Sequence, residues 1–230
     1  KESYSFVISE SLLFSCDVVY NRIYGNAFFG GEDLSNKELG NAQPLVNALL
    51  ERCKELFKFN GEVAKQLFLN DSFNIADKVD ISVNRKYFTE VIKYIPNQYV
   101  IEFHDDTKVS TSLRETTFNT ITHANVFLND EMILTVLVYD TINEEWLFRL
   151  DHNIRFPEKH IYFHSITWDV DYIKPEIVLM YELLDPIDYH QLPNYKKVID
   201  ALSYYQFVLL RVVVGDERIH QALISEKNAM

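Results

Sequence analysis

The chain has 230 residues, of which 47% are hydrophobic and 24% are charged, so it can bury a sizeable core as one domain or as two small ones. Its formal net charge is −12, and no run of Lys and Arg supplies a basic surface. This composition argues against a disordered chain and against duplex nucleic acid as the main ligand, whereas a free nucleotide carried with Mg²⁺ stays compatible.

We expect neither an export signal nor a membrane-inserted segment in this sequence. No run of 18 apolar residues occurs, and Glu2 and Glu10 fall where the core of a signal peptide would have to lie. Cys16 and Cys53 lie in apolar segments without a C-x-x-C spacing, which favours buried, reduced thiols over a disulfide or a metal site. We therefore expect a cytoplasmic protein without a membrane partner.

The first two predicted helices differ in the strength of their pattern. Residues 9–24 carry an apolar stripe that predicts an amphipathic helix, and we treat residues 1–40 as a helical extension. Residues 41–56 are a clearer helix, with Pro44 suited to its first turn and apolar residues at helical spacing. This second helix leads directly into the first predicted strand.

The central unit of the chain is a strand, a tight turn, a helix and a second strand. Residues 57–60 predict the first strand, and Asn60-Gly61 predicts the turn. A helix follows to about residue 69, and Val79–Val83 then alternates apolar and polar residues as a strand does. We expect Gly61 to adopt a positive φ or to be packed too closely for a Cβ.

After this unit the sequence predicts mixed strands and helices and then a helical tail. Asn84 is a good N-cap for a helix over residues 85–94, and the nearly continuous apolar run 132–140 predicts a central strand covered on both faces. From residue 166 the pattern is helical. We expect one helix from Pro175 to Leu184 and another from Pro193 to Val214, packed together, so the predicted domains are 1–40, 41–165 and 166–230.

Several of these segments resemble a known family. The Asn60-Gly61 turn and the strand Lys78-Val79-Asp80-Ile81-Ser82-Val83 resemble the opening of the nucleotidyltransferase fold of polymerase-beta-like enzymes. Further segments resemble, in the same order, its aminoglycoside-nucleotidyltransferase-like group, over roughly residues 43–225. These segments are Thr135–Asp140, Glu145-Trp146-Leu147-Phe148-Arg149, Arg155-Phe156-Pro157 and the helix after Tyr172-Ile173-Lys174.

The resemblance implies an α+β fold, with a nucleotidyltransferase-like mixed sheet and helices, plus a helical C-terminal domain. It also implies transfer of a nucleoside monophosphate from ATP or another nucleoside triphosphate to a small hydroxylated acceptor such as an aminoglycoside, with Mg²⁺. In that chemistry, carboxylates two residues apart on a strand hold the metal against the triphosphate. A glycine turn and a helix N-terminus present N–H groups to the phosphate oxygens.

The resemblance also assigns candidate site residues. The catalytic candidates are Asp80 and Asp140, and the metal candidates are Asp77 and Asp80. The nucleotide-binding candidates are Asn60, Gly61, Lys78 and Arg149. For Asp80 and Lys78 the alternative interpretation stays open that they are solvated side chains at the rim of a strand.

Four positions depart from the pattern of the family. Lys78 stands where the first carboxylate is expected, Asn60 replaces a glycine, Thr135 stands where a third carboxylate is expected, and Glu182 replaces a lysine. We therefore interpret the chain as a nucleotidyltransferase-fold protein with a degenerate metal site. Two alternatives remain open: an active Mg²⁺-dependent transferase that uses Asp77 and Asp80, and a non-catalytic module that binds a small molecule or a protein.

Overall fold

The computed structural model describes residues 40–105, 109–112, 118–184 and 195–229, with side chains up to Glu226. These residues belong to one compact unit, Leu39–Met230. The helix predicted at residues 9–24, together with Cys16 and Pro193, lies outside the described residues.

The described strands form a mixed sheet in the order β4-β3-β5-β6-β2-β1-β10-β9. Strand β1 is parallel to β10 and β2 is parallel to β6, and the other pairs are antiparallel. Two short strands extend it, β7 at the end of β6 and β8 beside β7. The bounds are β1 Phe57–Asn60, β2 Val79–Asn84, β3 Val100–His104, β4 Val109–Ser110, β5 His123–Leu128, β6 Glu131–Ile142, β7 Glu145–Leu147, β8 Arg155–Pro157, β9 Tyr162–Ser165 and β10 Val170–Ile173.

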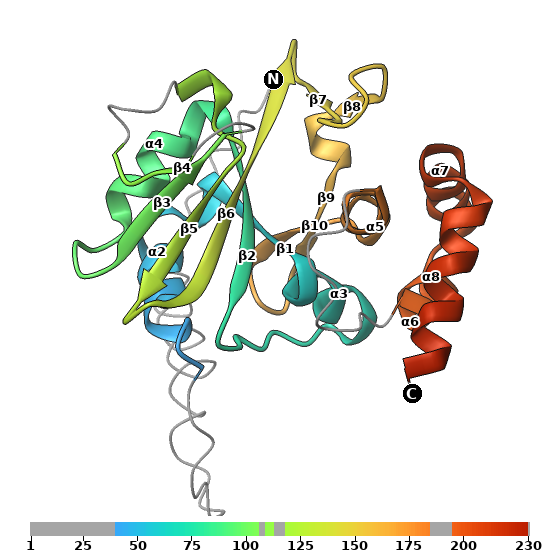
Figure 1. The fold of residues 1–230 in the computed structure, drawn as a ribbon, viewed down its shortest axis with the longest axis horizontal. Helices are drawn as coiled ribbons and strands as arrows, with labels where there is room; N and C mark the ends of the chain where they lie inside the picture. The colour runs from blue at the N-terminus through green and yellow to red at the C-terminus, as the bar shows by residue number, and fades with distance from the viewer. Residues whose placement is uncertain (1–39, 106–108, 113–117, 185–194, 230) are drawn as a thin grey trace, which may run out of the picture. The chain divides into compact units, whose positions relative to one another are not determined.

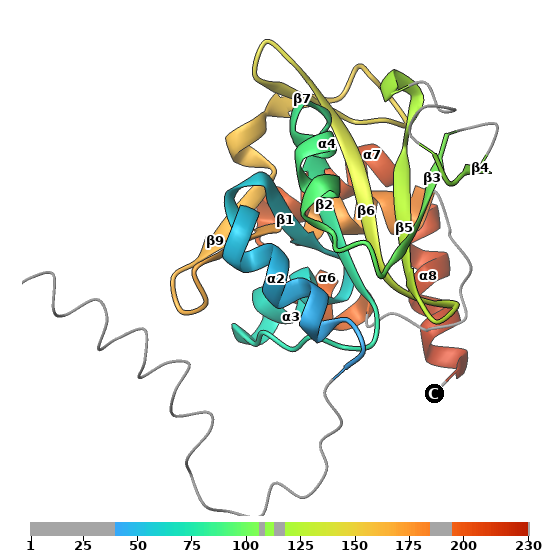
Figure 2. The same ribbon diagram turned by 90° about the vertical axis from the view of Figure 1, so that its left-hand side faces the viewer.

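Helices cover both faces of this sheet. Helices α2 and α4 lie on one face, and α5 with α7 lies beyond the other, while α3 lies close to β1 and β2 (Figures 1 and 2). The bounds are α2 Gln43–Cys53, α3 Gly61–Asn70, α4 Arg85–Tyr94, α5 Pro175–Leu184, α6 Tyr195–Ala201, α7 Tyr204–Val214 and α8 Asp216–Ala229, with short 3₁₀ turns at Lys54–Leu56, Phe118–Thr120 and Glu158–His160.

The alternation of side chains along the strands explains the two buried clusters. On β2, Val79, Ile81 and Val83 point to the α2 and α4 face and join one apolar cluster. A second cluster lies between the other face and the C-terminal helices, with Ile173, Leu179 and other apolar residues at its centre. The polar side chains of β2 therefore face the same side as this second cluster.

The structure confirms the α+β class and most of the predicted elements. The unit β1-turn-α3-β2 forms as expected, and the apolar run 132–140 lies within β6, a strand in the interior of the sheet order. The Asn84 side chain accepts a hydrogen bond from the Lys86 N–H and caps α4. Helix α5 begins at Pro175 and packs on α7, as predicted for the tail.

Two predictions for the C-terminal region are wrong. Val170–Ile173 is a strand, β10, so the change from strands to helices comes at Pro175 rather than at residue 166. The single helix predicted up to Val214 is two helices, α6 and α7. The cause of the break is Ser203, whose side chain forms a capping box with Gln206 and starts a new helix inside an apolar run.

None of the helices in the described ranges is both long enough and apolar enough to cross a membrane. On α7, the large apolar side chains of Tyr204, Tyr205 and Val212 are highly exposed.

Cys53 is a free, buried thiol, in agreement with the sequence prediction for this residue. Burial, with smaller contributions from Glu90 and Glu55, raises the pKa of the Cys53 thiol to about 11. We therefore expect alkylation at pH 8 to be about 100-fold slower in the native protein than in the unfolded chain, because only the thiolate reacts. Peptide mapping after iodoacetamide pulses, with and without denaturant, measures the two rates. Equal rates would contradict the prediction.

Candidate functional site

The Asn60-Gly61 turn lies directly against Asp80. Gly61 has a φ of 57° and starts α3, and a Cβ built on it would lie 2.6 Å from Asp80 Oδ2. The Asn60 side chain fixes the turn, because its Oδ1 accepts from the Gly61 N–H at 2.7 Å and its Nδ2 donates to Ser82 Oγ at 2.9 Å. Both expectations for Gly61, a positive φ and close packing, are confirmed.

A row of polar residues crosses the sheet at this turn. Asn60 on β1 pairs with Asp80 on β2, Asp80 pairs with Thr135 on β6, and Thr135 pairs with Asn125 on β5. We call these four residues the central polar row. Residues directly opposite each other on neighbouring strands share a face of the sheet, so Thr135 stands where a carboxylate would be needed to share a metal with Asp80. Asp80 is the only carboxylate among these four residues.

Lys78 supplies a positive charge beside that carboxylate. It precedes Asp80 by two residues, and its Nζ lies 3.8 Å from Asp80 Oδ1. Both side chains are partly exposed, at 46% and 31%, so the pair contributes little to stability. The ion pair matters for the site instead, because it places the Lys78 ammonium group close to the Oδ1 of Asp80.

Asp77 is hydrogen-bonded to the segment just before α2. Its Oδ1 accepts a hydrogen bond from the Asn41 N–H at 3.1 Å, just before α2. Asn41 in turn donates from Nδ2 to Glu131 Oε2 at 2.9 Å, so the loop before β2 is tied to the start of α2 and to β6.

Asp140 lies far from the central polar row. It is five residues beyond Thr135 on the same strand, a separation of about 17 Å. Its carboxylate forms a two-pronged pair with Arg85, at 2.5 Å to Nε and 2.9 Å to Nη2, and Arg85 also donates to the Ile121 carbonyl. Asp140 therefore anchors the start of α4, and the structure does not place it beside Asp80.

Arg149 follows β7, and its backbone N–H donates to the hydroxyl of Tyr181 at 3.4 Å. Its positive charge acts on His123, and Lys78 acts on the same imidazole. Two of the predicted nucleotide-binding cations are thus electrostatically linked to His123, a residue that the sequence analysis did not single out.

His104 and His123 form a stacked pair beside the central polar row. The two residues are paired in register on β3 and β5, and their rings lie 4.3 Å apart at an angle of 11°. The pKa of His123 is lowered to about 4, mainly by burial and to a smaller extent by the charges of His104, Arg149 and Lys78. His123 is therefore neutral at pH 7. The signal for this pair was the register of two strands, which one sequence does not reveal.

A second group of charges joins α3 to α5 near Asp80. Lys65 is 5% exposed, and its Nζ lies 3.1 Å from Glu182 on α5 and 3.4 Å from Glu62 on α3. Burial raises the pKa of Glu182, Lys65 opposes that shift, and the charges of Asp80 and Glu62 add to it. The two glutamates nearest to the turn are thus already paired with a lysine.

Within the described part of the chain, no group of three or more His, Cys, Asp or Glu side chains is arranged to hold a metal ion. The predicted Mg²⁺ therefore has one carboxylate of the central polar row, Asp80, as its candidate ligand. The pair of metal ligands that the resemblance implies, Asp77 and Asp80, stays a prediction, and in this structure Asp77 accepts a hydrogen bond from the Asn41 N–H.

No protein-family model matches the chain, and no curated protein matches its sequence. Among solved structures it is similar to the crystal structure of a "putative nucleotidyltransferase from H. pylori", with 11% sequence identity and a TM-score of 0.36. That similarity covers 84% of this chain and 94% of the other one. What this chain does is therefore inferred from its own residues.

Proposed function

We propose that this chain is a nucleotidyltransferase-fold protein with a degenerate metal site, which binds Mg²⁺-nucleotide weakly and does not transfer the nucleotide. The observation that carries the proposal is the pairing of Asp80 with Lys78 on one side and with Thr135 on the other. The family that the sequence resembles is expected to carry carboxylates at the positions of both neighbours. Here one neighbour is a cation and the other is a hydroxyl.

The charges around the turn also favour weak binding of a triphosphate. Asp80, Glu62 and Glu182 supply three carboxylates, and the lysines that they pair with, Lys78 and Lys65, supply two positive charges. A triphosphate without its metal would meet a net negative surrounding, and the first-turn Glu62 offsets the attraction of the N-terminus of α3 for anions.

The active-enzyme alternative requires a rearrangement. Asp77 would have to leave the Asn41 N–H and turn toward Asp80 while Lys78 moves away. The acceptor class, a small hydroxylated molecule such as an aminoglycoside, rests on the sequence resemblance and belongs to the same alternative.

Calorimetric titration with ATP, in the presence and absence of Mg²⁺, tests the proposal. We expect a Kd on the order of 1 mM or weaker, with little dependence on the metal and little change in Asp80→Ala. Asp77→Ala is the matched variant for the alternative, and a second titration in the presence of an aminoglycoside tests the acceptor. Tight binding that needs Mg²⁺, Asp80 and Asp77 together would overturn the degenerate-site proposal and support the active enzyme.

A further inference from the structure

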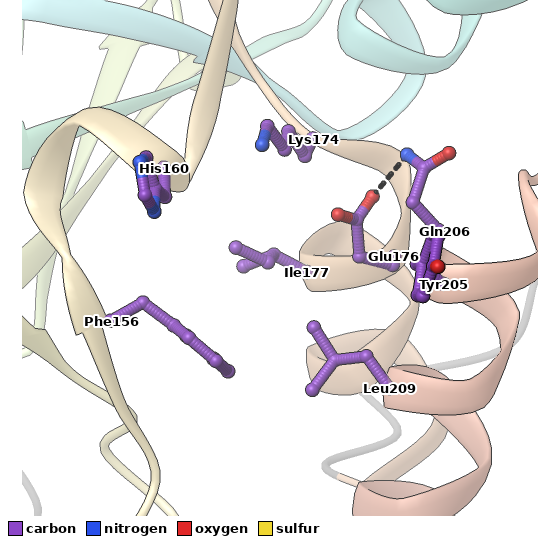
Figure 3. Close-up of a pocket in the computed structure, with 8 residues that line it drawn as sticks. All are labelled: Phe156, His160, Lys174, Glu176, Ile177, Tyr205, Gln206 and Leu209. Carbon is purple, nitrogen blue, oxygen red and sulfur yellow. Dashed lines mark hydrogen bonds between the residues drawn. The ribbon is translucent and has the colours of Figure 1, made fainter.

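A cavity of about 360 Å³ lies between the β8 segment and the helices α5 and α7 (Figure 3). It is separate from the central polar row. Phe156 in its wall pairs with Trp146, and Trp146 pairs with Thr141, six residues along β6 from Thr135, or about 20 Å. The lining residues are Phe156, His160, Lys174, Glu176, Ile177, Tyr205, Gln206 and Leu209.

The apolar walls of the cavity are fixed by the core behind them. The ring of Phe156 stacks on Trp146 with centroids 5.9 Å apart and an angle of 16°. Ile177 is 3% exposed, and Leu209 packs against the same buried cluster. The cavity is thus preformed, and its volume lies in the range of small-molecule sites, which are mostly apolar with a few placed polar groups.

Glu176 is the polar group that distinguishes this cavity. Its side chain belongs to a residue that is only 4% exposed, and its Oε2 accepts a hydrogen bond from Gln206 Nε2 at 2.7 Å (Figure 3). The oxygen of Gln206 accepts from the Ser203 N–H at 3.0 Å, so the amide is held with its nitrogen toward Glu176. Burial raises the pKa of Glu176.

Glu176 has no ion-pair partner among the described residues, although a lysine lies in the same cavity wall. The Lys174 ammonium lies 4.8 Å from the centroid of the Phe163 ring and is directed away from Glu176 (Figure 3). The charge of Lys174 still favours the ionised form of Glu176, but no ion pair forms between them among the described residues. A buried carboxylate without a close ion pair is costly, and the cost falls when a ligand places a positive charge in direct contact with it.

We propose that this cavity binds a small organic amine with an apolar body. The protonated amine donates to the Glu176 carboxylate, and the apolar body packs between Phe156, Ile177 and Leu209. The site does not depend on the nucleotide chemistry proposed above, since none of its lining residues belongs to the central polar row.

Three probes of one ring size test the charge requirement: benzylamine, benzyl alcohol and benzoate. Titrations of the full chain, followed by protein NMR or calorimetry, are expected to give a Kd on the order of 1 mM for benzylamine, since it has few atoms with which to bind. We expect benzyl alcohol to bind at least about 10-fold more weakly, and benzoate more weakly still, because it places a second negative charge beside Glu176.

Two variants locate the probe. Glu176→Gln keeps the shape and removes the charge, and it should weaken benzylamine about 10-fold or more. The matched control is Glu226→Gln, because Glu226 is also buried, at 6% exposed, and accepts from the Lys196 N–H at 2.9 Å outside the cavity. It should leave binding unchanged.

If Glu176→Gln does not fold, Leu209→Trp takes its place as the test. It fills the cavity and leaves the carboxylate in place, and it should abolish the binding of benzylamine. Equal binding of the amine and the alcohol, equal binding to the wild type and Glu176→Gln, or no binding of benzylamine would each overturn the proposal.

Discussion

The double substitution Lys78→Asp with Thr135→Asp is expected to raise the affinity for Mg²⁺ by about 100-fold or more over the wild type, which corresponds to ~2.7 kcal/mol. Thr135 pairs directly with Asp80 across neighbouring strands, which are about 4.8 Å apart. The Lys78 Nζ lies 3.8 Å from Asp80 Oδ1, so we expect a carboxylate at position 78 to lie close to Asp80. The substitutions add two anionic ligands and remove a competing cation.

Single substitutions supply the controls for this gain. Lys78→Ala removes the cation without adding a ligand, and Thr135→Asn changes the side chain without adding a charge. We expect each to change Mg²⁺ affinity by less than about 10-fold, since one carboxylate alone holds the ion weakly. Calorimetry with MgCl₂ gives the affinities, and circular dichroism checks the fold. A folded double variant with unchanged affinity would show that the two positions do not converge on Asp80.

Gly61→Ala is expected to lower the free energy of unfolding by about 2–3 kcal/mol. A φ of 57° costs a residue with a side chain about 1–2 kcal/mol. The added Cβ would also lie 2.6 Å from Asp80 Oδ2, so the carboxylate must move away from the turn. Denaturant unfolding of the two proteins measures the difference.

A double-mutant cycle separates the two contributions to this loss. In the background of Asp80→Ala, the oxygen that the new Cβ would meet is gone, and the next contact, to the Asp80 Cβ, is at 3.5 Å. We expect Gly61→Ala to cost about 1–2 kcal/mol there, the backbone part alone. The same cost in both backgrounds would mean that Asp80 moves freely and does not press on the turn.

Most of the fold follows from patterns that are local in the sequence. Asn60-Gly61 has the chemistry of a turn, the alternation around Asp80 marks a strand, and Pro175 marks the start of a helix. The prediction of a single helix up to Val214 failed because a capping signal interrupts the helical pattern. Ser203 lies inside an apolar run that continues a helical pattern, and its capping box with Gln206 decides the break between α6 and α7.

The sequence by itself determined which groups are available at the candidate site. Lys78 and Asp80 are two residues apart in the sequence, and they form an ion pair at the start of β2. What only the tertiary structure decided is which distant groups meet. Asp77 bonds to Asn41, and Asp140 pairs with Arg85 rather than approaching Asp80.

The tertiary structure also decided the contacts of groups that the sequence did not single out. His104 stacks on His123 because β3 and β5 pair in one register. Glu176 faces a cavity because α5 packs on α7 and Gln206 holds its carboxylate. Register and helix packing are set by the burial of the whole apolar core, and a one-residue shift of a strand would move each of its side chains to the other face. No pattern within a single segment carries that information.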